Sequence, residues 1–370
     1  MKKDWTYKKL GEVCETTSGG TPSKSKMEYY ENGDIPWLRS GELSNGEIYS
    51  TELCITQKGL DNSSAKIIPA GTVSIAMYGA TVGEVGIIKK PMCTNQAICN
   101  ILPNEQFIPN FIRYVLVAYK PKFISLATGG AQPNISQNII KNTSIPIPPL
   151  AIQRSIVAEL DLHHSVIEKK QEQLRALDNL AQSLFYQMFG DPITNPMGWE
   201  IKKLGEVAEN CDYMRKPITA SDRIPGNIPY YGASGIVDYV RDYIFDGDYL
   251  LVSEDGANLL ARSTPIAFSI SGKNWVNNHA HVLKFQESYT QLYVQTLINL
   301  IDISDIVTGA VQPKLNQAQL NKFPLPLPPL SLQQSFAAKV SAIEAQKQAI
   351  TQSIKDVESL LAQRMDHYFG

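Results

Sequence analysis

The sequence predicts an α+β protein: two mixed α/β domains joined by two long antiparallel coiled-coil helices, with a pseudo-twofold internal repeat. Three observations support this fold class. Short boxes of sequence occur twice along the 370 residues. The segments between the boxes are short, apolar and separated by glycine turns, as in mixed α/β domains. A stretch of about 40 residues without proline or glycine closes each half of the chain, which is typical of a long helix.

The repeat sets the order of the elements. Residues 5–13 (WTYKKLGEV) recur as residues 199–207 (WEIKKLGEV), an offset of 194. Two closing boxes recur at an offset of 180: residues 128–137 as 308–317, and residues 145–153 as 325–333. The first half therefore has 14 additional residues in its interior, where the two copies differ most. We interpret the two halves as copies of one structural framework whose interior sequences differ.

Within each half the apolar segments are short. Residues 70–78 and 248–253 are expected to form buried strands between glycine turns. Residues 107–118 and 290–298 are expected to form short helices. Both globular segments are therefore predicted to be mixed α/β domains.

The long segments, about residues 150–189 and 330–369, are predicted to be helices whose apolar side chains form a seam. A seam of this kind, sustained over about five heptads, is typical of a coiled coil, although two helices lying flat on their own domains remain an alternative. Gln153, His163 and Lys170 interrupt the first seam, and Gln333, Lys347 and Arg364 the second. The apolar seam positions are Ile156, Leu160, Ile167, Leu174, Leu177, Leu184, Phe336, Val340, Ile343, Ile350, Ile354, Val357 and Leu361.

Connectivity predicts how the helices run. We divide the chain into residues 1–149, 150–190, 191–329 and 330–370, two globular segments alternating with two helical regions. The second globular segment begins where the first helix ends and ends where the second begins, so a compact segment requires antiparallel helices. An antiparallel pairing that relates Lys170 to Ile350 would place polar interruptions beside apolar side chains, such as Arg364 by Ile156 and Lys347 by Leu174.

Composition excludes several classes of protein. No stretch reaches the roughly 18 to 20 apolar residues of a membrane helix, and the N-terminus lacks the apolar core of an export signal, so we expect a cytoplasmic protein without a membrane partner. The net charge is −2, with +3 on residues 1–149 and −4 on residues 191–329. The five cysteines follow no zinc or redox spacing, and we expect reduced thiols.

The sequence has no recognisable catalytic site. It lacks a Walker A loop, the Asn/Asp-Pro-Pro-Tyr/Phe motif of amino-methyltransferases, a His-Glu-x-x-His motif and a nucleophile elbow. His279 and His281 alternate on a predicted strand, but no third ligand is near them in the sequence. We therefore predict no catalytic residue, no metal and no cofactor in this chain.

Taken together, the repeated boxes, the variable interiors and the two long helices ending in Phe-Gly resemble the specificity (S) subunit of type I restriction-modification systems over essentially the whole chain. The resemblance implies a non-catalytic subunit whose two domains each read one half of a bipartite, asymmetric target in double-stranded DNA. It also implies two methyltransferase (M) subunits docked on the helices, and restriction (R) subunits bound through the complex. S-adenosylmethionine and ATP are then expected on those partners.

Candidate DNA contacts follow from residue type alone, because arginine and lysine suit phosphates and guanine while asparagine and glutamine suit adenine. For each of them a solvated charge or a turn-capping amide is an equal alternative. The candidates are Lys24, Lys26, Arg39, Tyr78, Thr81, Asn95, Gln96, Arg215, Lys216, Tyr231, Ser234, Arg241, Asn258, Arg262 and Asn278.

A second hypothesis of a different class stays open. The chain could be a non-catalytic coiled-coil scaffold that presents two ligand-binding globules to protein partners. Binding to duplex DNA would separate the two hypotheses, since the scaffold predicts none.

Overall fold

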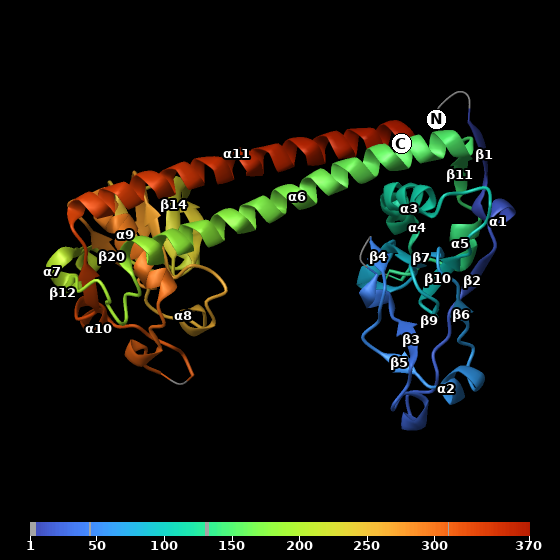
Figure 1. Ribbon diagram of the computed structural model, residues 1–370, viewed down its shortest axis with the longest axis horizontal. Helices are drawn as coiled ribbons and strands as arrows, with labels where there is room; N and C mark the ends of the chain where they lie inside the picture. The colour runs from blue at the N-terminus through green and yellow to red at the C-terminus, as the bar shows by residue number, and fades with distance from the viewer. Residues whose placement is uncertain (1–4, 44–45, 130–132, 310) are drawn as a thin grey trace. The chain divides into compact units, whose positions relative to one another are not determined.

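The computed structural model describes residues 5–43, 46–129, 133–309 and 311–370. The chain forms two compact units, Met1–Lys170 with Ser353–Gly370, and Gln171–Gln352. Each unit holds one globular domain together with parts of both long helices, which are α6 and α11 in Figure 1. Among the described residues, no helix is long and apolar enough to cross a membrane, and all five cysteines are free thiols.

The long helices have the predicted lengths and direction. They are α6 (Leu150–Phe189) and α11 (Leu330–Phe369). In the first unit the last turns of α11 lie beside the first turns of α6, where Arg364 Nη2 is 3.1 Å from Glu159 Oε2. In the second unit the first turns of α11 lie beside the last turns of α6, where the rings of Phe185 and Phe336 are 5.8 Å apart. Both contacts require antiparallel helices.

The seam is buried where it joins the domain cores. Ile156 and Leu160 belong to the core of the first unit, and Phe336 and Val340 to that of the second. Every other predicted seam residue is buried or half-buried: Ile167, Leu174, Leu177, Leu184, Ile343, Ile350, Ile354, Val357 and Leu361.

The two cationic interruptions on the second helix, Lys347 and Arg364, find polar partners, which the sequence pattern did not predict. Lys347 Nζ lies 2.8 Å from Asp178 Oδ1, and Arg364 binds Glu159. A cation in a partly dry seam gains more from a nearby carboxylate than from covering an apolar side chain. Gln153 and Gln333 are buried at the start of each helix and bond the backbone that precedes it.

The repeated boxes form the closure of each domain. In the first domain β1 (Thr6–Lys9) pairs antiparallel with β11 (Ser144–Ile147), and in the second β12 (Glu200–Lys203) pairs with β21 (Pro324–Leu327). The registers are equivalent, because the Thr6↔Ile147 pair becomes the Glu200↔Leu327 pair after offsets of 194 and 180. The prolines are tolerated because each sheet has only two strands and leaves N–H positions outside the ladder.

The helical parts of the boxes repeat as well. Helix α1 (Leu10–Val13) packs on α5 (Gln137–Lys141), and α7 (Leu204–Val207) packs on α10 (Gln317–Asn321). The opening and closing boxes therefore hold the two ends of each domain's chain together. The residues between them are free to differ.

The first domain contains two larger sheets. One has the order β2-β10-β7-β8-β4 and the other β5-β3-β9-β6. Besides α1 and α5, the α-helices of the first domain are α2 (Gln57–Asp61), α3 (Pro109–Ala118) and α4 (Lys120–Leu126). The strands are β2 (Thr16–Ser18), β3 (Ile35–Leu38), β4 (Glu47–Ile48), β5 (Cys54–Ile55), β6 (Ile67–Ile68), β7 (Val73–Ala76), β8 (Val85–Ile88), β9 (Met92–Thr94) and β10 (Ile98–Ile101).

The second domain repeats this plan with sheets β13-β20-β17-β18 and β15-β14-β19-β16. Besides α7 and α10, its α-helices are α8 (Asn258–Ala261) and α9 (Ser288–Leu300). Strand β4 has no counterpart in the described part of this domain, so it accounts for part of the first domain's additional length. The strands are β13 (Glu209–Asn210), β14 (Pro225–Gly232), β15 (Gly235–Val240), β16 (Phe245–Asp246), β17 (Tyr249–Ser253), β18 (Ala267–Ile270), β19 (Lys273–Val276) and β20 (Ala280–Lys284).

The strands and short helices expected from the sequence are present. Strands β7 and β17 lie within the two predicted strands, and both are fully buried. Helix α3 starts at Pro109 rather than at residue 107, because proline is preferred at the first helical position.

Candidate nucleic-acid interface

In each domain the chain passes from one sheet to the other through a three-residue loop, which we call the crossover loop. It comprises residues 95–97 in the first domain, between β9 and β10, and residues 277–279 in the second, between β19 and β20. An asparagine begins each loop and its side-chain oxygen accepts the N–H two residues on, at 3.2 Å for Asn95 and 2.8 Å for Asn277. The N–H of the same asparagine donates to the end of the parallel neighbour strand, Leu38 O in one domain and Tyr231 O in the other.

A second loop lies against each crossover loop. Met77 N donates to Ala97 O at 2.8 Å, and Glu254 N donates to His279 O at 2.9 Å. The next residue, Tyr78 or Asp255, forms a β-bridge to the segment that follows the Thr-Gly-x-x-Gln-Pro box. Three segments therefore meet at one place in each domain, and we call this place the junction.

The two junctions have equivalent backbones and different side chains. The hydrogen bonds and strand registers align them residue by residue. The first-domain residues and their second-domain counterparts are Ser18 and Asp212, Met77 and Glu254, Tyr78 and Asp255, Gln96 and Asn278, Ala97 and His279, Cys99 and His281, and Asn134 and Lys314.

The structure brings most first-domain candidates to the junction. Tyr78 and Thr81 lie on the second loop, and Asn95 and Gln96 form the crossover loop. Gln96 bonds the hydroxyl of Thr21. Arg39 follows β3 directly, but its guanidinium already binds Glu42 and Glu52.

Lys24 and Lys26 lie elsewhere in the first domain, in the loop before the 3-10 helix Met27–Tyr29. Both are exposed. Lys26 Nζ is 3.0 Å from Tyr29 Oη, and Lys24 has no hydrogen bond or ion pair recorded within the described ranges. Both remain candidates for phosphate rather than base contact, because they are not at the junction.

In the second domain, several candidates have structural duties. Arg262 adopts a left-handed conformation (φ 51°) after α8, and its guanidinium donates to Ile298 O at 3.2 Å and Ile301 O at 2.8 Å, at the end of α9. Asn258 binds Ser263 and Thr264 and so holds the turn after α8. Arg262 and Asn258 therefore have structural roles, and their contact with DNA stays a prediction.

The other second-domain candidates lie at or near the sheets' ends. Tyr231 and Ser234 belong to the β14–β15 hairpin, and Ser234 is exposed. Arg241, just after β15, is 62% exposed and 3.7 Å from Asp242. Lys216 is exposed and lines a pocket of about 400 Å³ together with Arg241 and Trp275. Asn278 is an exposed residue of the crossover loop.

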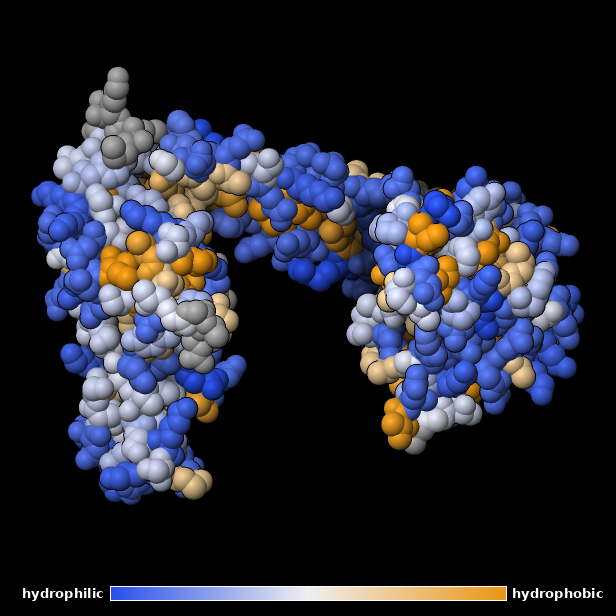
Figure 2. Space-filling view, turned by 180° about the vertical axis from the view of Figure 1, so that it is seen from behind, coloured by the Kyte–Doolittle hydropathy of each residue, from blue (hydrophilic) through white to orange (hydrophobic). Residues whose placement is uncertain are grey.

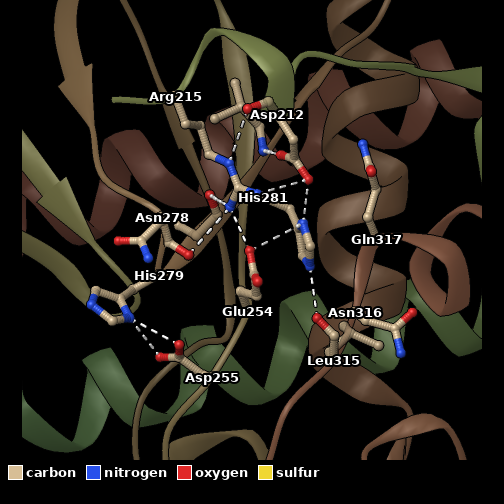
Figure 3. A network of polar contacts seen from close by, with 12 residues as sticks. Asp212, Arg215, Glu254, Asp255, Asn278, His279, His281, Leu315, Asn316 and Gln317 are labelled. Atoms are coloured by element: carbon tan, nitrogen blue, oxygen red, sulfur yellow. Dashed lines mark hydrogen bonds and ion pairs between the residues drawn. The ribbon is translucent and has the colours of Figure 1, made fainter. Parts of the chain in front are cut away.

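Arg215 is inside the second domain, in a buried ion network beneath the junction (Figure 3). Its Nη1 is 2.5 Å from Glu254 Oε2, and its Nη2 is 3.3 Å from Asp212 Oδ2. The same guanidinium donates to the carbonyl oxygens of Asn278 (3.4 Å) and Ala280 (2.9 Å), on either side of His279. Arg215 therefore positions the crossover loop, and its contact with DNA stays a prediction.

His281 completes the network with no solvent exposure. Its Nδ1 lies 2.5 Å from Asp212 Oδ2, and its Nε2 lies 2.8 Å from Leu315 O. A carbonyl oxygen can only accept, so Nε2 carries hydrogen and donates to Leu315 O, while Nδ1 faces the carboxylate of Asp212. Lys314 Nζ, 3.1 Å from Glu254 Oε1, adds a further cation at the surface.

The two carboxylates are held ionised. Burial raises the pKa of Asp212. Hydrogen bonding and charge from His281, with a smaller effect from Arg215, lower the pKa by more than burial raises it, so the pKa of Asp212 is below its ordinary value. The pKa of Glu254 is also lowered, because the effects of Arg215, His281 and Lys314 outweigh its burial. The network is therefore a set of compensated charges.

The same residues have the outline of a metal site, since ligand atoms of Asp212, Glu254 and His281 lie within 4.8 Å of one another. The chemistry of the group does not fit a metal ion. The guanidinium of Arg215 already balances the carboxylates, and both ring nitrogens of His281 are engaged in hydrogen bonds within the protein. Sequence reasoning considered His281 with His279 and missed Asp212, which is 69 residues away along the chain.

His279 belongs to the crossover loop, just before β20 begins at Ala280, and its ring is directed away from His281 and the buried network (Figure 3). Its Nδ1 is 2.9 Å from both oxygens of Asp255. Its side chain is 49% exposed and that of Asp255 is 16% exposed. Neither residue was selected from the sequence as a DNA contact, because a lone histidine beside an asparagine carries no specific signal.

Comparison with known proteins agrees with this architecture. The sequence profile of the type I restriction modification DNA specificity domain matches residues 2–177 and again residues 196–359. The specificity subunit of type I restriction enzyme MjaIX from Methanocaldococcus jannaschii is 27% identical over 384 residues, covering 93% of this chain and 87% of that protein. The EcoR124I/EcoR124II specificity subunit from Escherichia coli is 32% identical over 160 residues, covering 42% and 40%.

Solved structures show the same fold at lower identity. A chain from a structure of a type I R-M system, solved to describe complex assembly and conformational transition, matches with a TM-score of 0.65 and 20% identity, covering 99% of this chain and 97% of that one. The S subunit from M. genitalium matches with a TM-score of 0.55 and 15% identity, covering 99% and 96%. Because the family profile matches both halves of the sequence, the chain belongs to the type I restriction-modification DNA specificity domain family.

Proposed function

We propose that this chain is the non-catalytic subunit that reads a bipartite, asymmetric DNA target, with one half-site for each globular domain. The observation that carries the proposal is the pair of junctions, which share a backbone framework and differ in nearly every side chain. Two identical frameworks allow the same mode of docking on DNA. Different side chains on that framework favour two unlike half-sites.

Charge supports phosphate contacts by lysine more than by arginine in the second domain. Arg215 and Arg262 are committed to the domain interior, and Arg223 pairs with Asp238. Lys216 and Lys273 are exposed, and no ion pair is recorded for either lysine in the described chain. With a net charge of −4 on residues 191–329, we expect much of the phosphate contact to come from partner subunits.

Two exposed leucine pairs support docking of two copies of one partner, the M subunits. Leu150 and Leu330 are repeat equivalents at the starts of α6 and α11, and are 36% and 55% exposed. Leu180 and Leu360 are also repeat equivalents, 51% and 44% exposed. Each unit thus presents one leucine from each helix, Leu150 with Leu360 and Leu330 with Leu180. A repeated apolar feature fits two copies of the same protein.

Figure 2 shows apolar residues among hydrophilic ones along the helices and on the visible face of each unit, as expected of surfaces that bind partners. R subunits are then expected to join through the complex. S-adenosylmethionine and ATP would be bound by the M and R subunits, since no cofactor motif occurs in this sequence.

Mapping of modified adenines tests the proposal. The chain is expressed with its cognate M subunit in a host without adenine methylation, and the DNA is sequenced at single-molecule resolution. We expect methylation at two unlike short sequences at a fixed separation of about one helical turn. Methylation of a continuous site, or methylation that is independent of this chain, would contradict the proposal and favour the scaffold alternative.

The absence of catalysis has its own test. The purified chain without M or R subunits is expected to show no methyl transfer, ATP hydrolysis or DNA cleavage. Turnover of labelled S-adenosylmethionine by the isolated chain would contradict this part of the proposal.

A further inference from the structure

The junction of the second domain contains an exposed side chain that is held in place and has one unused polar atom. The Nδ1 atom of His279 lies 2.9 Å from both carboxylate oxygens of Asp255. For Nε2 of the same ring, no hydrogen bond is recorded among residues 5–43, 46–129, 133–309 and 311–370, and the side chain is 49% exposed. Figure 3 shows the ring outside the buried network.

The backbone that carries His279 is fixed from several sides. Its N–H donates to Asn277 Oδ1 at 2.8 Å, and its carbonyl accepts from Glu254 N at 2.9 Å. Arg215 holds the neighbouring carbonyl oxygens of Asn278 and Ala280, and Asp212 and Glu254 hold Arg215. The buried ion network therefore fixes the position of the crossover loop, which carries His279 at the surface.

The equivalent positions in the first domain lack both members of this pair. Ala97 stands where His279 stands, and Tyr78 stands where Asp255 stands, although the surrounding backbone hydrogen bonds are the same. A residue needed only for the fold would be expected to recur with the framework. A residue that reads one half-site would be expected to differ, because the two half-sites differ.

We propose that His279 is a specificity-determining residue that reads the major-groove edge of a guanine in the half-site bound by the second domain, with Asp255 and Arg215 as positioning residues. This inference rests on the proposed function. Asp255 accepts from Nδ1–H, and the doubly protonated form of the ring then has Nε2–H as a donor directed to solvent. Guanine presents two acceptors, N7 and O6, on its major-groove edge, whereas cytosine presents an N–H₂ donor there.

The test maps methylated sites for variants of the full chain in complex with the M subunit. His279→Ala is expected to relax one G·C position in the second domain's half-site by about ten-fold or more, which is the discrimination of a good base contact. The first half-site and the spacing are expected to stay unchanged. Asp255→Asn keeps the shape but removes the charge, and is expected to relax the same position to a smaller extent.

A variant that prefers a different base distinguishes loss of a base contact from misfolding of the domain. Glutamine is suited to adenine N6 and N7, so His279→Gln is expected to shift the preferred base at that position from guanine towards adenine. Misfolding cannot produce a new preference at a single position. Gln286→Ala, an exposed residue just beyond the opposite end of β20, is the matched control and is expected to leave the whole target unchanged.

The outcomes distinguish failure of the proposed function from failure of the role assigned to His279. If the wild-type chain directs no bipartite methylation, the proposed function fails. If the wild-type target is bipartite but His279→Ala and His279→Gln both leave the second half-site unchanged, the assignment of His279 is overturned. Relaxation of an A·T position, or equal relaxation of all positions, would also overturn it.

Discussion

Arg215 is the residue on which the buried charges of the second domain depend. Its side chain is 13% exposed and lies between Asp212 and Glu254, which are 5% and 11% exposed. We expect Arg215→Met to destabilise the second domain by about 3–5 kcal/mol, since removing one partner leaves buried charge uncompensated. Hydrogen exchange of peptides from β17 and β20 measures this locally.

The first domain supplies the matched control for that variant. Its structural counterparts of Asp212, Glu254 and His281 are Ser18, Met77 and Cys99. Thr21 matches Arg215 by the repeat offset of 194. Met77 and Cys99 are buried, and burial raises the pKa of Cys99 to about 12, so this site is neutral. The quadruple replacement of the network by these residues is expected to cost less than Arg215→Met alone, because no unpaired charge remains. If the quadruple replacement destabilises the domain more than Arg215→Met does, the charged network itself makes a net contribution to stability.

The same network predicts that the second domain loses stability in acid. The pKa values of Asp212 and Glu254 are lowered in the folded state, with burial opposed and exceeded by His281, Arg215 and Lys314. Their contribution is therefore complete above the unfolded values, roughly pH 4 to 4.5, and is lost as pH falls through the lower folded values. Denaturant unfolding of the second domain between pH 3 and 6 should show this loss in the wild type. The quadruple variant should not share it.

At the scale of the elements, two buried glutamines begin the long helices at equivalent positions. Gln153 accepts from Ile108 N at 3.0 Å and donates to Gln106 O and Pro148 O at 2.9 and 3.0 Å. Gln333 donates to Pro328 O at 2.7 Å, and its buried Oε1 has no partner among the residues described.

These glutamines should therefore differ in their contribution to stability. At about 1 kcal/mol for each bond, Gln153→Met is expected to destabilise the first unit by about 2–3 kcal/mol, and Gln333→Met the second by about 1 kcal/mol or less. Hydrogen exchange at the start of each helix compares the two. Equal costs would mean that the shared fold, rather than the bonds, determines the effect.

The helices also carry the prediction about partner number. Leu360→Glu is expected to remove one of two M subunits, and Leu180→Glu the other, because a carboxylate buried in an apolar contact is costly. Leu162 is 63% exposed, but its repeat equivalent is Ala342, so Leu162→Glu is the control and should leave two M subunits bound. Native mass spectrometry counts the subunits. Loss of both after a single change would contradict independent docking surfaces.

For the whole molecule, the two domains should be exchangeable modules. Their closing strands pair in equivalent registers, so the interior can change while these strands stay the same. Replacing residues 14–127 by the corresponding segment of another family member is expected to change one half of the methylated sequence and leave the other half intact. Methylation mapping reads the result, and simultaneous change of both halves would contradict the modular arrangement. The half that stays intact is the one in which His279 should act.

Periodic and repeated features were predictable from the sequence. The heptad spacing predicted both 40-residue helices, and the duplicated boxes predicted a shared framework, because both are local patterns that a chain repeats wherever it folds the same way. The direction of the helices followed from connectivity. Residue type alone also selected Gln96 and Asn278, which do lie at equivalent places in the two junctions.

Only the tertiary structure decided which polar side chains are free at the surface. Arginine is a good DNA ligand by type, yet Arg215 and Arg262 are committed to carboxylates and backbone carbonyls inside the second domain. Asp212, Glu254 and His281 come from strands and loops far apart in sequence, so no spacing could predict that they would meet. Burial without water forces such groups to find partners within the protein, and those partners are chosen by the packing of distant segments.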